Sequence, residues 1–177
     1  MTVLAKTLVS YQTIYGSTKE AASMIVKTLE DEYQLQVDVH KFEENKEYPD
    51  ISKYENIVIG SCIFHGKWGR NAEEFLKHDF KDKNIAIFIC AGFSGEKELY
   101  EQAINTFLRG NIEKYTHVKP VSIEAFGGRV PKSKIPHMWF LQASKRLASF
   151  RYDTRDLVKV KGWAHKLGKI FTEKNNQ

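Results

Sequence analysis

Two continuous apolar runs constrain the fold of this chain more than any other feature. Residues 57–61 (IVIGS) and 85–92 (IAIFICAG) contain only apolar or small side chains. A strand with one face in water alternates apolar and polar residues, whereas a central parallel strand is buried on both faces and shows no alternation. We therefore expect two central strands of a parallel sheet, each ending in a loop rather than a hairpin.

The segments beside these runs carry helical periodicity, with apolar residues three or four positions apart on one helical face. Because parallel strands are joined by crossovers, the alternation predicts an α/β fold with helices on both faces of the sheet. Further strands are expected at residues 3–9, 35–39 and 117–126, the second of them at a half-exposed edge. The helical faces are set by Ala21, Ile25 and Leu29, by Ala72, Phe75 and Leu76, by Leu99, Ala103 and Phe107, and by Trp163, Leu167 and Phe171.

A hydroxyl-rich turn lies between the first predicted strand and the first predicted helix. The first backbone N–H groups of a helix have no partner within it and carry partial positive charge, so an anion is stabilised there. Gly16 permits a tight backbone, and the hydroxyl groups around it can donate to the same anion. The alternative is that Ser17 only caps the helix. We expect a phosphate at this turn, held by Thr13, Ile14, Tyr15, Gly16, Ser17 and Thr18.

The turn resembles the phosphate loop of flavodoxin-like FMN proteins, whose pattern is Ser/Thr-x-Thr-Gly-x-Thr. Thr13, Gly16 and Thr18 match this pattern, Ser17 stands at its variable position, and Tyr15 replaces the usual Thr. The Gly-x-Gly-x-x-Gly and Gly-Lys-Ser/Thr nucleotide motifs are both absent, which favours FMN over NAD or ATP. The resemblance implies a flavodoxin-like doubly wound sheet of five parallel strands in the order 2-1-3-4-5, with the FMN crevice between strands 1 and 3.

In that fold the loops after strands 3 and 4 bound the flavin ring. Small residues let backbone approach a flat ring, and aromatic side chains can stack on it. The alternative is that Phe64 and Trp68 only fill the helix–sheet interface and that Ser94 caps a plain turn. His65 beside the flavin can donate a hydrogen bond, bind a substrate carboxylate or move a proton, or it can be exposed without a role. The expected ring contacts are Ser61, Cys62, Ile63, Phe64, His65, Gly66, Ala91, Gly92 and Phe93.

Composition narrows the function classes. The 177 residues suit a single domain spanning residues 1–177, and the formal charge of +5 with a pI near 9.1 favours an anionic partner. No nucleic-acid-binding module is recognisable, which leaves an acidic lipid surface or a small acid. Neither a membrane-spanning apolar stretch nor a signal-peptide pattern is present, so we expect a cytoplasmic protein. Cys62 and Cys90 are expected to be buried thiols, and the scattered histidines predict no metal site.

A basic, aromatic insert of about residues 127–160 separates the last predicted strand from the last helix. Residues 129–152 contain no acidic side chain, and apolar residues are interleaved with the cations. Such a segment suits a helix lying on an anionic membrane, a binding site for an apolar carboxylated molecule, or packing against the domain or a second subunit. The expected contact residues are Arg129, Lys132, Lys134, Trp139, Phe140, Lys145 and Arg146.

Together these features resemble the menaquinone-dependent protoporphyrinogen oxidase family. The resemblance rests on the Tyr-Gly-Ser-Thr turn, the strand ending in Ile-Gly-Ser followed by a His-Gly pair, Phe-Gly-Gly after the last strand, the basic insert, and Asp153-Thr154-Arg155 before the final helix with Trp163. It implies an FMN enzyme of haem biosynthesis that oxidises protoporphyrinogen IX and passes the electrons to a membrane quinone at the inner face of the cell membrane.

Two other functions remain open at this point. The FMN site alone also suits an electron carrier or a quinone reductase without porphyrin activity, and Tyr15 at the Thr position suits a module that no longer binds FMN. The spacing of Asp153 and Arg155 favours an ion pair that holds the insert closed.

Overall fold

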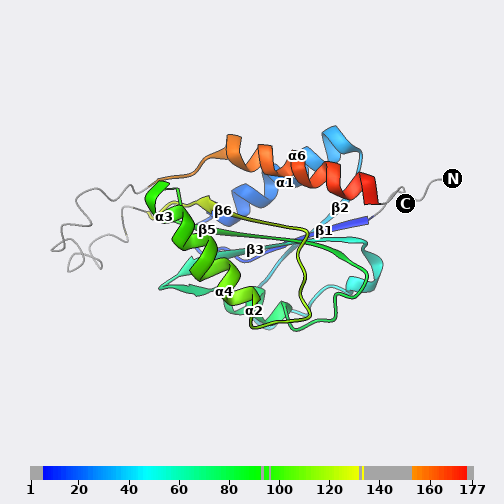
Figure 1. The fold of residues 1–177 in the computed structure, drawn as a ribbon, viewed down its shortest axis with the longest axis horizontal. Coiled ribbons are helices and arrows are strands. Elements are labelled where there is room, and N and C mark those ends of the chain that lie inside the picture. The colour runs from blue at the N-terminus through cyan, green and yellow to red at the C-terminus, as the bar shows by residue number, and fades with distance from the viewer. Residues whose placement is uncertain (1–5, 93, 96, 132, 134–152, 175–177) are drawn as a thin grey trace.

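The sheet of this protein is doubly wound and mostly parallel (Figure 1). The computed structural model describes residues 6–92, 94–95, 97–131, 133 and 153–174. Within these ranges, five parallel strands follow the order β2-β1-β3-β5-β6, which is the predicted order 2-1-3-4-5 when they are numbered along the chain. The strands are β1 (Lys6–Tyr11), β2 (Gln36–Lys41), β3 (Asn56–Phe64), β5 (Asn84–Ala91) and β6 (Ser122–Gly127).

Helices cover both faces of the sheet, as the periodicity predicts. In Figure 1, α1 and α6 lie together over one face, and α2, α3 and α4 lie over the other. The helix predicted after β5 is present, but a π-helical stretch, η2, forms its middle. The bounds are α1 (Ser17–Tyr33), a short 3-10 helix η1 (Ile51–Lys53), α2 (Arg70–Phe75), α3 (Lys97–Gln102), η2 (Ala103–Arg109), α4 (Gly110–Ile112) and α6 (Leu157–Lys174).

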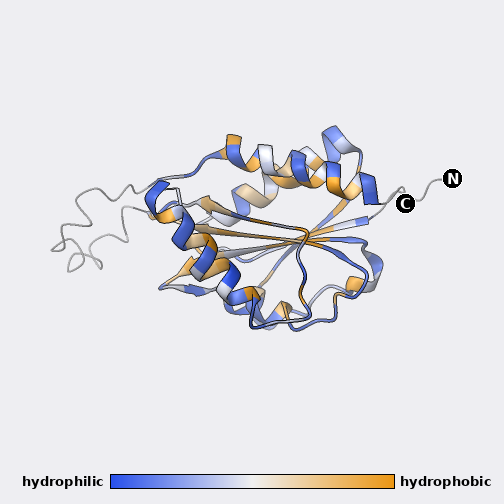
Figure 2. Cartoon of the chain, in the orientation of Figure 1, coloured by the Kyte–Doolittle hydropathy of each residue, from blue (hydrophilic) through white to orange (hydrophobic). Residues whose placement is uncertain are grey.

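Two apolar cores lie on opposite sides of the sheet. Ile57 and Ile59 of β3 face the core shared with α2, whereas Val58 between them faces the core shared with α1 and α6. All three side chains are fully buried. Figure 2 shows apolar colour along the central strands and on the helices that cover them. Burial on both faces explains why this run shows no alternation in the sequence.

One sequence prediction about β3 is wrong. Residues 57–61 were expected to end in a loop, but the strand continues to Phe64 and turns through a two-residue hairpin into β4 (Lys67–Trp68), which pairs antiparallel with β3. Both turn residues have positive φ, 48° at His65 and 74° at Gly66. This backbone matches the twist of paired strands, and glycine adopts it without strain. Phe64 and His65 therefore lie at the tip of a hairpin.

Packing between α1 and α6 depends on a glycine. A Cβ atom at Gly168 would lie 2.4 Å from the ring of Tyr33, which hydrogen bonds to His165 hold in place. We expect Gly168→Ala to lower the free energy of unfolding by roughly 1–3 kcal/mol, the usual effect of overpacking. Gly162→Ala on the same helix is the control: nothing lies within 4 Å of a Cβ there, so the change should be neutral or stabilising. Urea denaturation of both variants measures the difference.

Candidate functional site

The turn between β1 and α1 presents unpaired backbone donors. Gly16 caps α1 in a left-handed conformation, with φ 93°, and its N–H donates to Thr13 Oγ1 at 3.0 Å. No side chain caps the helix, and within the described ranges the N–H groups of Ser17 and Thr18 have no acceptor. This helix of 17 residues therefore begins with backbone N–H groups that have no hydrogen-bond acceptor in the described part of the chain. Such an arrangement binds anions.

The hydroxyl groups of this turn are only partly engaged. Ser17 Oγ accepts a hydrogen bond from the backbone N–H of Arg129 at 2.9 Å, which leaves the Ser17 proton able to donate to an anion. Thr13 Oγ1 is likewise an acceptor, for the Gly16 N–H. The Thr18 side chain is 1% exposed, and its hydroxyl has no oxygen or nitrogen partner among the described residues. The alternative in which the Ser17 side chain caps α1 is wrong, because no such bond forms.

Two buried thiols lie next to this turn. Cys62 of β3 and Cys90 of β5 are register partners on neighbouring strands, and both are free. Burial raises the pKa of both thiols, to about 12 for Cys90, although Thr18 beside Cys90 and the backbone of Ile14 beside Cys62 oppose the shift. The prediction of buried thiols is confirmed, and both stay protonated at neutral pH.

We expect neither thiol to react with Ellman's reagent in the folded protein, because a protonated buried thiol is a poor nucleophile. Both should react promptly once urea unfolds the chain. The absorbance of the released thionitrobenzoate, followed with and without urea, measures this. Fast reaction in native buffer would mean that a thiolate is accessible beside the turn.

The β3–β4 hairpin and the β1–α1 turn meet through aromatic side chains. The rings of Tyr15 and Phe64 pack edge to face with centroids 6.1 Å apart, and His65 packs on Phe64 at 4.2 Å. Phe64 is 42% exposed, whereas Trp68 is buried and its Nε1 donates to the Phe107 carbonyl at 2.6 Å. The interface-filling interpretation therefore applies to Trp68, and Phe64 presents an aromatic surface to the outside.

The side chains of Ser61 and Ile63, two other residues of β3 expected to contact the ring, bond within the hairpin or pack on the core. The buried Ser61 hydroxyl accepts the Gly69 N–H at 3.0 Å and donates to the next backbone carbonyl at 3.1 Å. Ile63 packs on the core beside α2. Contact of Ser61, Cys62 and Ile63 with the flavin ring stays a prediction, as does contact with Phe64 and His65.

The loop after β5 is closely packed, and a residue outside the predicted site covers it. Ala91 is buried, and Phe93 lies outside the described residues. Ser94 does not cap α3, because its buried hydroxyl has no partner in the described part of the chain. Thr154 covers this loop and donates from Oγ1 to the Gly92 carbonyl at 2.8 Å. The only sequence signal for this contact is the glycine content of the loop, which permits a close approach.

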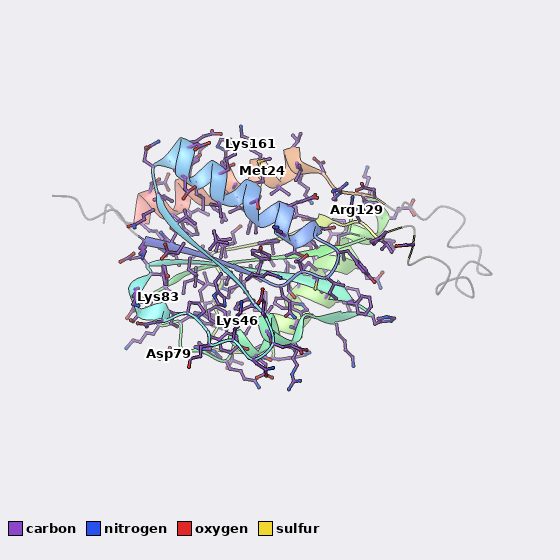
Figure 3. The ribbon with its side chains drawn as sticks, turned by 180° about the vertical axis from the view of Figure 1, so that it is seen from behind. Met24, Lys46, Asp79, Lys83, Arg129 and Lys161 are labelled. Atoms are coloured by element: carbon purple, nitrogen blue, oxygen red, sulfur yellow. The ribbon has the colours of Figure 1, made fainter. Side chains whose placement is uncertain are left out.

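Both ends of the insert are anchored beside α1. Arg129 and Asp153 form an isolated antiparallel bridge, and the Thr154 N–H donates to the Gly128 carbonyl at 3.0 Å. Figure 3 shows Arg129 at the end of the sheet where the carboxyl ends of the strands lie. The remaining predicted contacts of the insert lie outside the described residues and stay predictions: Lys132, Lys134, Trp139, Phe140, Lys145 and Arg146.

Arg155 ties the end of the insert to α1. Its Nη1 donates to both Glu20 oxygens at 2.8 and 2.6 Å, and its Nε and Nη2 donate to Asp153 at 2.8 and 2.5 Å. Hydrogen bonding to Arg155 lowers the pKa of the Asp153 carboxyl to about 2. The ion pair expected between Asp153 and Arg155 is present. The bond to Glu20 was missed, because it joins residues 135 positions apart.

Residues 8–139 match the Flavodoxin domain family. This chain belongs to the flavodoxin family. The flavodoxin-like domain-containing protein BilS of Clostridioides difficile is 30% identical over 131 residues, which cover 73% of this chain and 67% of that protein. A protoporphyrinogen IX dehydrogenase (quinone) of Escherichia coli is 36% identical over 75 residues, which cover 41% of this chain and 39% of that protein. The match to the Escherichia coli enzyme thus spans well under half of its length.

The flavodoxin fold is also evident from solved structures. Oxidised flavodoxin 2 of Bacillus cereus resembles this protein with a TM-score of 0.56 and 19% identity, over 96% of this chain and 99% of that one. The cofactor of the flavodoxin domain is FMN. The interpretation based on Tyr15, that this protein is a module that no longer binds FMN, is therefore not supported.

The residues present fit this cofactor. The open N–H groups at the start of α1 suit the phosphate of FMN, and the exposed ring of Phe64 suits its flavin. When bound, FMN supplies the transfer of electrons. In the described part of the chain, no three His, Cys, Asp or Glu side chains gather as a metal site would require, and no helix combines the length and apolarity needed to cross a bilayer.

Proposed function

We propose that this flavodoxin-family protein oxidises protoporphyrinogen IX to protoporphyrin IX and passes the electrons to a quinone. The partial match to an enzyme named for that reaction supports the proposal. The main support for the proposed activity is the position of the two ends of the insert. Near its start and its end, the insert is bonded to the first turn of α1, through Arg129 to Ser17 and through Arg155 to Glu20.

The proposed substrate matches the chemistry of the insert. Protoporphyrinogen IX is an apolar macrocycle that carries propionate carboxylates. Lys and Arg side chains pair with carboxylates, and aromatic side chains pack on flat or apolar rings. We assign these contacts to Arg129 and to the insert residues Lys132, Lys134, Trp139, Phe140, Lys145 and Arg146.

The proposed electron acceptor, a membrane quinone, suits a group of exposed apolar side chains, here called the apolar rim, at the carboxyl edge of the sheet. Helices α1, α3 and α6 all start at this edge in Figure 1. Exposed apolar side chains lie in the turns and helix starts there, and their exposure runs from 39% at Leu99 to 84% at Val158. An apolar rim on a protein of net charge +5 favours an anionic bilayer, where a membrane quinone resides. We propose peripheral contact with the inner face of the cell membrane through Ile14, Phe64, Leu99, Leu157 and Val158.

The proposed reaction needs a ring contact and a proton carrier from the chain. Tyr15 and Phe64 would bound the flavin, because they pack edge to face and the Phe64 ring is exposed. His65 is exposed beside Phe64, so its imidazole could accept a proton from the porphyrinogen and release it to water. When bound, FMN would supply the transfer of electrons between the porphyrinogen and the quinone, and the quinone would also take up protons to become a hydroquinone.

An anaerobic assay tests this proposal. The FMN-loaded protein is mixed with protoporphyrinogen IX and menadione, and the fluorescence of the porphyrin product is followed. We expect product to form many times faster than with the same concentration of free FMN, and only when menadione is present. A rate equal to that of free FMN would contradict the proposal.

A second function is an FMN electron carrier or a quinone reductase without porphyrin activity. The family match over residues 8–139 and the likeness to flavodoxin 2 favour it. Under this alternative, the chemically reduced protein would pass electrons quickly to a ferredoxin-type acceptor or to menadione. The same preparation would form no porphyrin.

A further inference from the structure

Arg155 lies between the carboxylate of Glu20, in the first turn of α1, and the carboxylate of Asp153. Its guanidinium donates to both oxygens of Glu20 and, on its other side, to Asp153. The Glu20 and Arg155 side chains are 41% and 26% exposed, so water and salt screen this pair only in part. Arg129, which is bridged to Asp153, adds a second cation. These four charges sum to zero, and the exposed Lys19 of the same helical turn is a further cation.

The same helical turn is where the phosphate of FMN is proposed to lie. The N–H groups of Ser17 and Thr18 are open within the described ranges, and the buried Thr18 hydroxyl has no oxygen or nitrogen partner there. Glu20 belongs to this first turn as well. A phosphate and an unpaired carboxylate in one turn repel each other, and they compete for the same positive end of the helix dipole.

We infer that Arg155 sets the charge of the cofactor's phosphate site by neutralising Glu20. Arg155 is then a positioning residue that acts through Glu20, and it does not touch FMN itself. The inference rests on the proposed placement of the FMN phosphate at α1. Its consequence is selectivity for a flavin that carries a phosphate monoester over riboflavin, which has none.

Binding of FMN and of riboflavin to the full-length chain, stripped of cofactor, tests this inference. Arg155→Gln should weaken FMN binding roughly tenfold, the effect of one unit charge at close range in a partly exposed site. Riboflavin binding should not change. Adding Glu20→Gln to Arg155→Gln should restore most of the FMN affinity, and Glu20→Gln alone should tighten FMN binding. Quenching of flavin fluorescence gives each Kd.

Two outcomes would overturn the inference and leave Arg155 a structural role only. One is equal weakening of FMN and riboflavin binding in Arg155→Gln, and the other is no recovery in the double variant. If Arg155→Gln does not fold, Glu20→Gln alone decides, because an unchanged FMN affinity there also overturns the inference. Arg155→Lys keeps the charge and is the matched control, with near-normal FMN binding. None of these measurements uses porphyrin formation, so the fate of the proposed oxidase activity is tested separately.

Discussion

Replacing residues 130–152 with an Asn-Gly turn is expected to abolish porphyrin formation while the protein still folds and binds FMN. Activity should fall by roughly a hundredfold or more, as happens when substrate positioning is lost. Folding should persist because the described residues of both apolar cores lie outside this range. The antiparallel bridge between Arg129 and Asp153 brings the two ends together, so a two-residue turn can join them. Visible absorption, urea denaturation and the porphyrin assay measure the three properties.

A full-length variant distinguishes the effect of the insert's positive charge from the effect of deleting the whole insert. Exchange of Lys132, Lys134, Lys145 and Arg146 for Gln keeps the length of segment 130–152 and removes all of its cations except Arg151. The KM for protoporphyrinogen IX should then rise more than kcat falls, because these cations would bind carboxylates rather than the reacting carbons. Undiminished porphyrin formation by the shortened protein would contradict the assignment of the insert to the substrate.

Gly127→Ala is expected to destabilise the protein and to weaken FMN binding. A Cβ at this position would lie 1.8 Å from the backbone carbonyl oxygen of Thr154. Because this neighbour is main chain, no change of rotamer relieves the overlap, and the segment around Thr154 must move away. We expect a loss of at least the roughly 1–3 kcal/mol that overpacking usually causes. FMN affinity should fall as in Arg155→Gln, since Arg155 directly follows the displaced residue. Urea denaturation and FMN titration measure the two effects.

Thr154→Ala is the control for this prediction. It removes the hydroxyl that bonds to Gly92 but leaves the carbonyl that obstructs position 127. Combining it with Gly127→Ala should therefore give no recovery of stability or of FMN binding. Recovery in the double variant would identify the Thr154 side chain, and not its backbone, as the obstacle.

The fold could be predicted because its signals are local. β3 and β5 appear as short apolar runs, and the apolar faces of α1 and α6 appear as residues four apart that share one core. The turn around Gly16 lies within six consecutive residues, 13–18. Family membership and the FMN cofactor were predictable for the same reason, since a loop motif and an order of strands and helices can be read from neighbouring residues.

The hairpin and the anchoring of the insert could not be predicted, because they depend on distant partners. The bond between Arg129 and Ser17 joins residues 112 positions apart. The β3–β4 turn begins with His65, where hairpins of this type favour Asn, Asp or Gly. Its conformation is supported by strand pairing and by the bond from Trp68 to the Phe107 carbonyl. A single sequence carries no local pattern for such contacts.

The bridge between Arg129 and Asp153 also bears on how proteins of this kind can diversify. Since the two ends of the insert already touch, the chain between them can lengthen, shorten or change composition without shifting the sheet or either core. Evolution can then replace this segment as a unit and change the residues that are proposed to contact the substrate near the flavin. New reactivities would arise by replacing the segment between these two residues, while the sheet and the two cores continue to supply the stability of the fold.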